Sequence, residues 1–156
     1  MYGKILIPID PEKLSWMAFL HAFRIAEMCN SEVYIIHASS KLLSDDEEMM
    51  LRVSLDKFHN GEDREIRRVT GMVLEFLQQE GLRELACKIS YKIDVIPEHD
   101  DRIKAIHQFC ASNGIDLIVL GMKSRRSALE LFKSNISKWA TLFPECPVLV
   151  VHDVRD

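Results

Sequence analysis

The sequence predicts one α/β domain, in which a five-stranded parallel sheet carries helices on both faces. Short apolar segments of strand length alternate with longer segments of helical periodicity along the 156 residues. Most of the strand segments are apolar at consecutive positions, which is typical of strands that are buried on both faces of a parallel sheet. No repeat, low-complexity segment or linker divides the chain, so a single domain over residues 1–156 accounts for all of it.

The composition argues against several classes of function. Apolar residues make up 47% of the chain and the formal net charge is −4, which indicates a soluble globular protein without a nucleic-acid-binding surface. No segment approaches the ~20 apolar residues that cross a bilayer, and no leader segment precedes the first strand, so we expect no membrane partner. The four cysteines lack the spacing of a zinc site or a disulfide framework, which indicates a reducing, cytoplasmic location.

The chain begins with a strand, a helix and a second strand. The apolar run 5–9 predicts a buried strand, which Asp10 and Pro11 end. Apolar residues recur at three- and four-residue steps over 12–29, which predicts an amphipathic helix. The segment 32–38, EVYIIHA, predicts the second strand.

The middle of the chain is less regular. Residues 39–60 show no clear period and contain the acidic run 45–48, so we expect a mobile loop with a single helical turn and a solvated acidic face. The apolar spacing over 66–77 predicts a second helix, which Gly81 ends. The alternating segment 86–96 predicts a third strand with one partly exposed face, as an edge strand has.

A third helix and two strands complete the domain. Asp100 or Asp101 caps a helix with apolar residues on one face over 103–110, and Gly114 ends it. The apolar run 117–120 predicts the fourth strand. The remaining elements are a loop at 121–134, a short helix at 136–143 and a last strand at 147–151.

The expected strand order, 3-2-1-4-5, indicates where a ligand would bind. Open parallel sheets bind ligands beyond the carboxyl ends of the strands, at the point where the winding direction reverses. In this order that point lies between the first and fourth strands, so the residues concerned are 8–11 and 120–124. The loop 121–134 also follows a strand and precedes a helix, which is the usual position of a phosphate-binding loop.

Four segments together resemble the universal stress protein family over nearly the whole chain. They are the opening KILIPID, the second strand ending in IIHAS, the fourth strand DLIVLG and the closing CPVLVV. The resemblance implies a Rossmann-like fold similar to that of adenine nucleotide alpha hydrolases. It also implies a homodimer, which in this family often forms through the last strands. Here those residues are Val148, Leu149, Val150 and Val151.

The nucleotide-binding branch of the family carries a signature after the fourth strand, and this chain keeps only part of it. The signature is a glycine, two residues, a glycine, nine residues, and a glycine followed by serine or threonine. Its positions fall on Gly121, Ser124, Ser134 and Asn135, so two of three glycines are replaced. The aspartate that contacts adenine in that branch corresponds to Asp10. The neighbouring contacts would fall on Pro8, Ala38, Leu120 and Ile136.

The two serines predict a weakened site. Glycine adopts positive φ without strain and lets backbone N–H groups approach a phosphate closely. A serine in that conformation costs roughly 1 to 2 kcal/mol, and each ~1.4 kcal/mol is a factor of ten in affinity. Two replacements would therefore weaken binding about a hundredfold. Ser134 and Asn135 still offer side-chain hydrogen bonds, so ATP or AMP binding at a weakened site is the alternative.

The same loop is basic, which has two interpretations. Either the positive charges attract an anion, or they are an ordinary solvated surface. The only acid between residues 121 and 138 is Glu130. The basic residues there are Lys123, Arg125, Arg126, Lys133 and Lys138.

Other groups of reactive residues are sparse. His107 and Cys110 have the spacing of two metal ligands on a helix, but nothing near them in sequence supplies a third, so no metal is predicted. His37 ends the second strand near the expected site, either as a packed side chain or as an acid, base or ligand contact. No motif of a hydrolase, metalloprotease or P-loop enzyme is present.

The sequence thus predicts a cytoplasmic regulatory or binding module in stress response, and not an enzyme. We expect no tightly held cofactor. The alternatives are a switch that binds ATP or AMP at the residues named above, and a weak nucleotide hydrolase that uses the same crevice.

Overall fold

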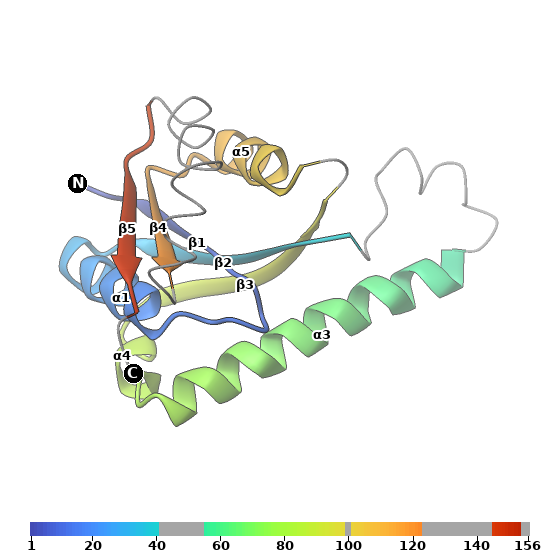
Figure 1. Ribbon diagram of the computed structural model, residues 1–156, viewed down its shortest axis with the longest axis horizontal. Coiled ribbons are helices and arrows are strands. Elements are labelled where there is room, and N and C mark those ends of the chain that lie inside the picture. Colours follow the sequence, from blue (N-terminus) through green and yellow to red (C-terminus); the bar gives the residue numbers. More distant parts are fainter. Residues whose placement is uncertain (41–54, 99–100, 123–144, 154–156) are drawn as a thin grey trace.

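The computed structural model describes residues 1–40, 55–98, 101–122 and 145–153, which form a five-stranded sheet covered by helices (Figure 1). The strands are β1 (Lys4–Pro8), β2 (Glu32–Ser39), β3 (Ser90–Pro97), β4 (Leu117–Met122) and β5 (Val148–His152). The helices are α1 (Trp16–Cys29), α3 (Leu55–Gln79), α4 (Arg83–Ala86) and α5 (Arg102–Asn113).

The sheet is parallel and has the order β3-β2-β1-β4-β5, which confirms the predicted topology. Strand β1 lies at the centre and pairs with β2 on one side and β4 on the other. The first three residues after Lys4 are almost fully buried, because a central strand of such a sheet has helices over both faces.

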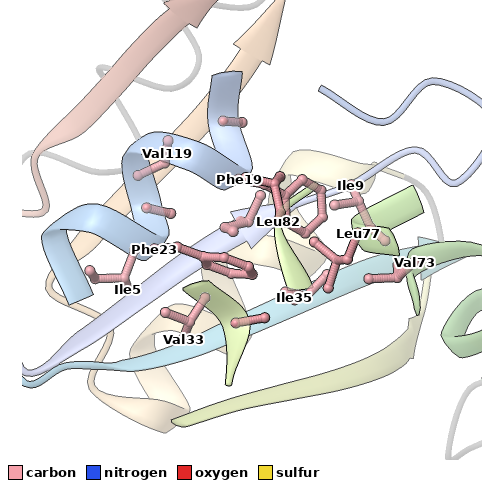
Figure 2. Close-up of a cluster of buried hydrophobic side chains, with 14 of the residues drawn as sticks. Ile5, Ile9, Phe19, Phe23, Val33, Ile35, Val73, Leu77, Leu82 and Val119 are labelled. Carbon is pink, nitrogen blue, oxygen red and sulfur yellow. The ribbon is translucent and has the colours of Figure 1, made fainter. Parts of the chain in front are cut away.

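Two apolar clusters cover the two faces of the sheet. Helices α1, α3 and α4 pack on one face, where the aromatic rings of Phe19 and Phe23 lie over β1 and β2 (Figure 2). Helix α5 packs on the other face through Ile103, Ile106 and Cys110. Each fully buried Ile or Phe side chain in these clusters contributes about 1.5–3 kcal/mol of hydrophobic stabilisation. The alternation of strand residues between the two clusters is the expected consequence of the period-two pleat.

The first helix begins later than the sequence predicts. Residues 12–14 lie outside it, and α1 starts at Trp16 after the N-cap Ser15, whose hydroxyl accepts a hydrogen bond from the Ala18 N–H at 3.2 Å. The segment before it is a turn in which the Lys13 N–H donates to the Asp10 carbonyl at 2.9 Å. Pro11 at the second position favours that turn over a helix.

The second helix is much longer than predicted. Helix α3 has 25 residues and begins at Leu55, so the prediction of a loop over residues 39–60 is wrong from 55 onward. At about 1.5 Å per residue it spans roughly 38 Å, against roughly 26 Å for an eight-residue strand. Figure 1 accordingly shows its first turns extending beyond the ends of β2 and β3. The sequence of these first turns shows no clear apolar period, so periodicity does not reveal them as helix. The acidic run 45–48 lies outside the described residues.

Smaller differences concern β3 and β4. Strand β3 begins at Ser90, because residues 83–86 form the short helix α4 and not the start of a strand. Strand β4 continues through Met122, so Gly121 is part of the sheet, where it pairs with Val151, and not the first loop residue. Three predicted ends are confirmed: Gly81 and Gly114 have positive φ where α3 and α5 end, and Asp101 caps α5. The predicted helix at 136–143 lies outside the described residues.

No helix in the described part of the chain combines the length and the apolar character that a membrane span requires.

Candidate functional site

The turn after β1 is the centre of the candidate site. Asp10 holds this turn twice: its carbonyl accepts from the Lys13 N–H, and its carboxylate Oδ1 accepts from the Glu12 N–H at 3.1 Å. Such an Asx turn fixes the direction of the carboxylate without using all of its acceptor sites. The turn lies at the carboxyl end of β1, between the last residues of β2 and β4, as expected for a ligand site in this fold.

His37 connects β2 to the start of this turn. The Ile9 N–H donates to the Ile36 carbonyl at 2.9 Å, and the Ile9 carbonyl faces His37 Nδ1 at 3.3 Å. The imidazole of His37 thus links β2 to Ile9, the first residue after the last strand pair, Pro8 with Ile36. Its ring is buried, with 8% of the residue exposed, so its orientation is set by these contacts.

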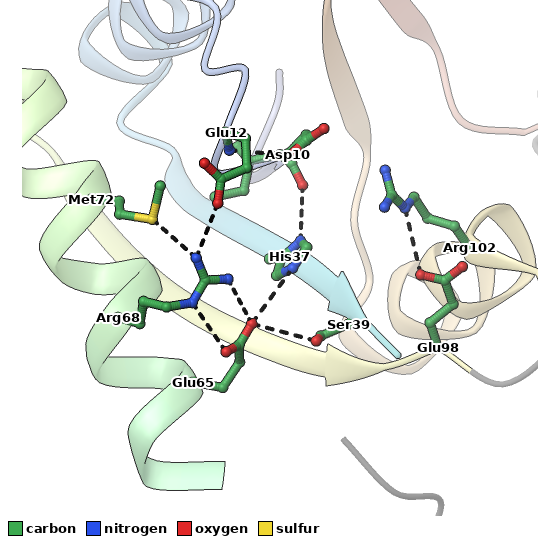
Figure 3. A network of polar contacts seen from close by, with 10 residues as sticks. Asp10, Glu12, His37, Ser39, Glu65, Arg68, Met72, Glu98 and Arg102 are labelled. Carbon is green, nitrogen blue, oxygen red and sulfur yellow. Dashed lines mark hydrogen bonds and ion pairs between the residues drawn. The ribbon is translucent and has the colours of Figure 1, made fainter. Parts of the chain in front are cut away.

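A carboxylate from α3 faces the other side of the same ring. Glu65 Oε1 lies 3.9 Å from His37 Nε2 and 3.4 Å from the Ser39 hydroxyl, which donates to it (Figure 3). Arg68, one turn further along α3, donates to both oxygens of Glu65 at 2.9 and 3.2 Å. Glu65 is 6% exposed, and a carboxylate at that depth requires such a partner.

Arg68 also reaches the turn. Its guanidinium donates to Glu12 Oε1 at 3.2 Å, so one side chain on α3 holds both the buried Glu65 and the exposed Glu12. The hydrogen bond to Glu65 raises the pKa of Arg68, which stays charged at any physiological pH. We call Ile9, His37, Glu65, Arg68 and Glu12 the polar ring, because together they enclose the turn from β2 and α3.

The ionisation of His37 is set by opposing effects. Burial lowers the pKa of His37 below its ordinary value, because the charged ring would lose its water. The hydrogen bond with the Ile9 carbonyl and the charges of Glu65 and Asp10 oppose this shift, while the charge of Arg102 adds to it. The neutral ring is therefore the main form at pH 7.

The helix on the other face of the sheet begins close by. The Asp101 carboxylate caps α5 by accepting from the Ile103 N–H at 2.9 Å. Arg102 lies 3.7 Å from Glu98, and Figure 3 shows this pair across β2 from Glu65 and Arg68. The turn of Asp10 thus has charged groups of both signs on two sides.

Gly121, on the opposite side of β1, is retained for a reason of packing. A Cβ atom at this position would lie deep inside the van der Waals distance of Ser15 Cβ and Oγ, and 3.1 Å from Ala18 Cβ. Its φ is not in the left-handed region, so space and not backbone conformation demands glycine. The first turn of α1 can therefore lie directly on the backbone of β4.

The start of α1 is also held from β5. The Trp16 N–H donates to the Asp153 carboxylate at 3.0 Å, while the Asp153 N–H donates to the Met122 carbonyl at 2.7 Å. A carboxylate beside a helix N-terminus is favourable because it satisfies an N–H group and complements the helix dipole. The two N-terminal N–H groups of α1 that face Ser15 and Asp153 are thus already used by the protein.

The structure brings together those predicted site residues that it describes. Pro8 ends β1, Asp10 follows it in the turn, and Ala38 lies near the end of β2. Leu120 and Gly121 lie in the last part of β4, beside β1 in the sheet order. The other predicted site residues lie outside the described residues; they are Ser124, Ser134, Asn135 and Ile136.

Sequence reasoning missed most of the polar ring. Nothing in the sequence sets Glu65 and Arg68 apart from other charged residues, although their spacing of three residues on a helix is a usual one for an ion pair. A buried acid cannot be told from an exposed one by sequence alone, since both occur among the charged residues of an amphipathic helix. Ser15 carried a clearer signal, because serine is a preferred N-cap residue.

Burial makes metal binding by the pair on α5 less favourable. Burial raises the pKa of Cys110 to about 12, so the group is a protonated thiol, whereas the thiolate binds metals. Among the residues that the structure describes, no group of three or more His, Cys, Asp or Glu side chains is arranged to hold a metal ion.

Comparison with known proteins agrees with this architecture. The family model described as the universal stress protein family matches residues 1–152. The chain belongs to the universal stress protein family. No curated protein matches the sequence.

Solved structures of universal stress proteins share the fold. The chain is 18% identical to the universal stress protein UspA from Lactobacillus plantarum, with a TM-score of 0.54 over 96% of this chain and 97% of that one. A family protein from Burkholderia pseudomallei is 16% identical, with a TM-score of 0.52 over 96% of each chain. A family protein from Arabidopsis thaliana, solved with AMP bound, is 11% identical, with a TM-score of 0.52 over 96% of this chain and 91% of that one.

Proposed function

We propose that this universal stress protein is a cytoplasmic regulatory or binding module without enzymatic turnover, and that it binds adenine nucleotides weakly. The observation that carries the proposal is the replacement of two signature glycines by Ser124 and Ser134. Both positions lie outside the described residues, and the sequence pattern alone distinguishes them. The scattered cysteines, which are typical of a reducing compartment, support the location.

The structure adds support from the one signature glycine that remains. Gly121 has no room for a side chain because Ser15 packs against it. Selection for packing alone is therefore enough to retain it, and its presence is no evidence for a phosphate-binding loop. The remaining support for nucleotide binding is Asp10, whose carboxylate keeps free acceptor capacity at the end of β1.

Restoring the signature tests this proposal directly. The triple variant Ser124→Gly, Ser134→Gly, Asn135→Ser is expected to bind ATP about a hundredfold more tightly than the wild type, because each glycine removes roughly 1–2 kcal/mol of strain. Isothermal titration with ATP and Mg²⁺ measures the change. The matched control is Ser127→Gly, which lies between the signature positions 124 and 134 in sequence and should leave affinity unchanged. Equal affinity in the wild type and the triple variant would contradict the proposal.

A second candidate is a switch that binds AMP. It is favoured by the Arabidopsis thaliana relative with AMP bound and by the position of Asp10 at the carboxyl end of β1. AMP needs fewer phosphate contacts than ATP, so loss of the signature glycines would weaken the binding of AMP less than the binding of ATP. The protein is purified from cells and denatured, and the released material is analysed by mass spectrometry. The result decides between the AMP switch and the weak nucleotide site. Stoichiometric AMP would establish the switch, and its absence would favour the weak site.

The absence of turnover is tested separately. Incubation with ATP, ADP or AMP should release no product above a heat-treated sample. Nucleotide hydrolysis that is lost in Asp10→Asn would show instead that the protein is an enzyme.

We further propose that two copies pair through β5. This strand lies at the edge of the sheet and hydrogen-bonds with β4 on one side. The Ile118 N–H donates to the Pro147 carbonyl and the Asp153 N–H to the Met122 carbonyl. By the parallel ladder pattern the N–H groups of Val148 and Val150 therefore point away from β4, to a side of β5 where no described strand pairs with it. Exposed edges of this kind invite pairing with another chain.

A proline at the free edge tests this dimer. Val150→Pro removes an N–H group that β4 does not use, so it should abolish pairing while it leaves the sheet intact. The matched variant Val150→Thr keeps the N–H group and should remain dimeric. Light scattering at micromolar concentration measures both masses, and circular dichroism checks the fold. A wild-type monomer would contradict the proposal.

A further inference from the structure

The chemistry of the Ile9 carbonyl decides the protonation of His37. A carbonyl oxygen only accepts hydrogen bonds, so the Nδ1 atom that faces it at 3.3 Å must carry a proton. In the neutral ring only one nitrogen is protonated. Neutral His37 is therefore the Nδ1–H tautomer, and its Nε2 atom presents a lone pair.

That lone pair faces another acceptor. Nε2 lies 3.9 Å from Glu65 Oε1, which is too far for a hydrogen bond, and the carboxylate is instead drawn to Arg68 at 2.9 Å. Two acceptors that face each other repel. A proton at Nε2 would turn this contact into a charge-assisted hydrogen bond and would shorten it.

The geometry links this proton site to the turn of Asp10. The polar ring runs from the Ile9 carbonyl through His37, Glu65 and Arg68 to the Glu12 carboxylate. Glu12 and Ile9 flank Asp10 in sequence, and the Glu12 N–H donates to its carboxylate. A shift of the Glu65 side chain would therefore change the contacts of Ile9, through His37, and of Glu12, through Arg68.

The charged groups around His37 come from each element packed near it. Glu65 approaches from α3, Asp10 from the turn after β1, and Arg102 from the start of α5. Arg68 pairs with Glu65, and Glu12 pairs with Arg68, so both influence His37 indirectly through Glu65. Among the residues that the structure describes, two carboxylates and one guanidinium thus act directly on the ring, while burial opposes its charge.

We propose that His37 is a positioning residue for the Asp10 turn, and that a proton at its Nε2 atom draws Glu65 away from Arg68 and toward β2, so that acidification alters the turn. The neutral ring holds the turn through the Ile9 carbonyl alone. The charged ring holds the Ile9 carbonyl and Glu65 together, and Arg68 is left with a weaker hold on Glu65 and a stronger one on Glu12. This inference does not require the protein to bind nucleotide.

The tautomer of His37 is measured on the wild-type protein. Long-range ¹H–¹⁵N spectra of the ring nitrogens of the full chain, recorded between about pH 5 and about pH 8, where histidines titrate, report which nitrogen is protonated. We expect Nδ1–H and a bare Nε2 at the high end, with protonation of Nε2 as the pH falls. An Nε2–H tautomer at the high end would overturn the proposal without any variant.

The response of the turn is measured in the same series. The backbone N–H groups of Glu12 and Lys13, which both donate to Asp10, should shift with the same midpoint as the His37 ring. A midpoint near pH 4 would instead report the carboxylates, whose ordinary pKa values are about 4. That result, or no shift at all, would overturn the coupling.

Variants separate positioning from simple packing. His37→Asn keeps an N–H donor near the Nδ1 position but has no titrating group, so the turn should persist while its pH response is lost. Glu65→Gln should also remove the response, and it should lower the pKa of His37 further because the charge of Glu65 raises it. The matched controls are His21→Asn on α1 and Glu75→Gln on α3, which lie outside the ring and should keep the response. A response that survives in His37→Asn would contradict the proposal.

Discussion

The two sides of β1 are held in contrasting ways. Toward β2 and α3, the end of the strand is enclosed by the polar ring, in which a buried acid, an arginine and a histidine hold the turn of Asp10. Toward β4 and α1, contact is made by close packing of Ser15 on Gly121, with the helix start capped by Ser15 and Asp153. The first depends on charge and therefore on pH. On the second side, the contact of Ser15 with Gly121 depends on shape and tolerates no added atom.

Both arrangements support the same region, the carboxyl ends of β1 and β4, where ligands bind in this fold. The difference indicates a division of roles. The close-packed side fixes the position of α1 against the sheet, whereas the polar side has alternative hydrogen-bonding states. A structural response to a change in pH is therefore expected at Asp10 and not at Gly121.

The largest expected effect comes from filling the close contact. Gly121→Ala places a Cβ atom inside Ser15, so we expect a loss of about 3 kcal/mol in the free energy of unfolding, at the upper end for overpacking. Urea denaturation measures it. The double variant Ser15→Gly, Gly121→Ala removes the obstructing side chain and should recover most of the loss, because glycine at an N-cap costs only a few tenths of a kcal/mol. Failure of this rescue would mean that Ser15 is not what excludes the side chain.

A smaller effect is expected on the polar side. Glu65→Ala removes the acceptor of two Arg68 hydrogen bonds, which should reduce the free energy of unfolding by about 2 kcal/mol, the range for bonds to charged groups. The loss is limited because the Arg68 side chain is 37% exposed and can turn to water. Glu75→Ala on the same helix is the matched control, with an expected change near zero. If the two variants are equally stable, the polar ring contributes nothing to the fold.

The smallest effect is a dependence of stability on pH. Burial lowers the pKa of His37 in the folded state, so the unfolded chain binds a proton more readily. Where the unfolded state binds more protons, stability rises with pH. The neutral ring therefore contributes its full share to the free energy of unfolding above the ordinary histidine pKa of 6.5. That share is lost as the pH falls below 6.5 toward the pKa of His37 in the folded protein. Urea midpoints measured across this range should fall with acidification less steeply in His37→Asn than in the wild type.

The sequence predicted the fold because the central strands are apolar on both faces. The runs at 5–9 and 117–120 admit few positions other than the middle of a covered parallel sheet. Local signals also located several element ends, since Gly81, Gly114 and Asp101 act through their own backbone or through a cap within a few residues. These features need no knowledge of distant partners.

The candidate site was predicted less completely. Strand order and family pattern indicated Asp10, Pro8, Ala38, Leu120 and Gly121, and the structure places these residues at the ends of neighbouring strands. The long start of α3 was missed because the sequence of its first turns shows no clear apolar period. The predicted loop from residue 123 onward lies outside the described residues, so the roles of Ser124 and Ser134 remain predictions.

The sequence by itself determined the class of fold and the altered glycine pattern, because hydrophobic periodicity, turn chemistry and motif spacing are local properties. The strand order was an expectation for this class of fold, and the pairing of the strands confirmed it. Only the tertiary structure decided why Gly121 cannot change and what holds Asp10. The first depends on Ser15, more than a hundred residues away in the chain, and the second on Glu65 and Arg68 meeting His37 across two elements. Such contacts depend on distance and burial, which exist only once the helices lie on the sheet.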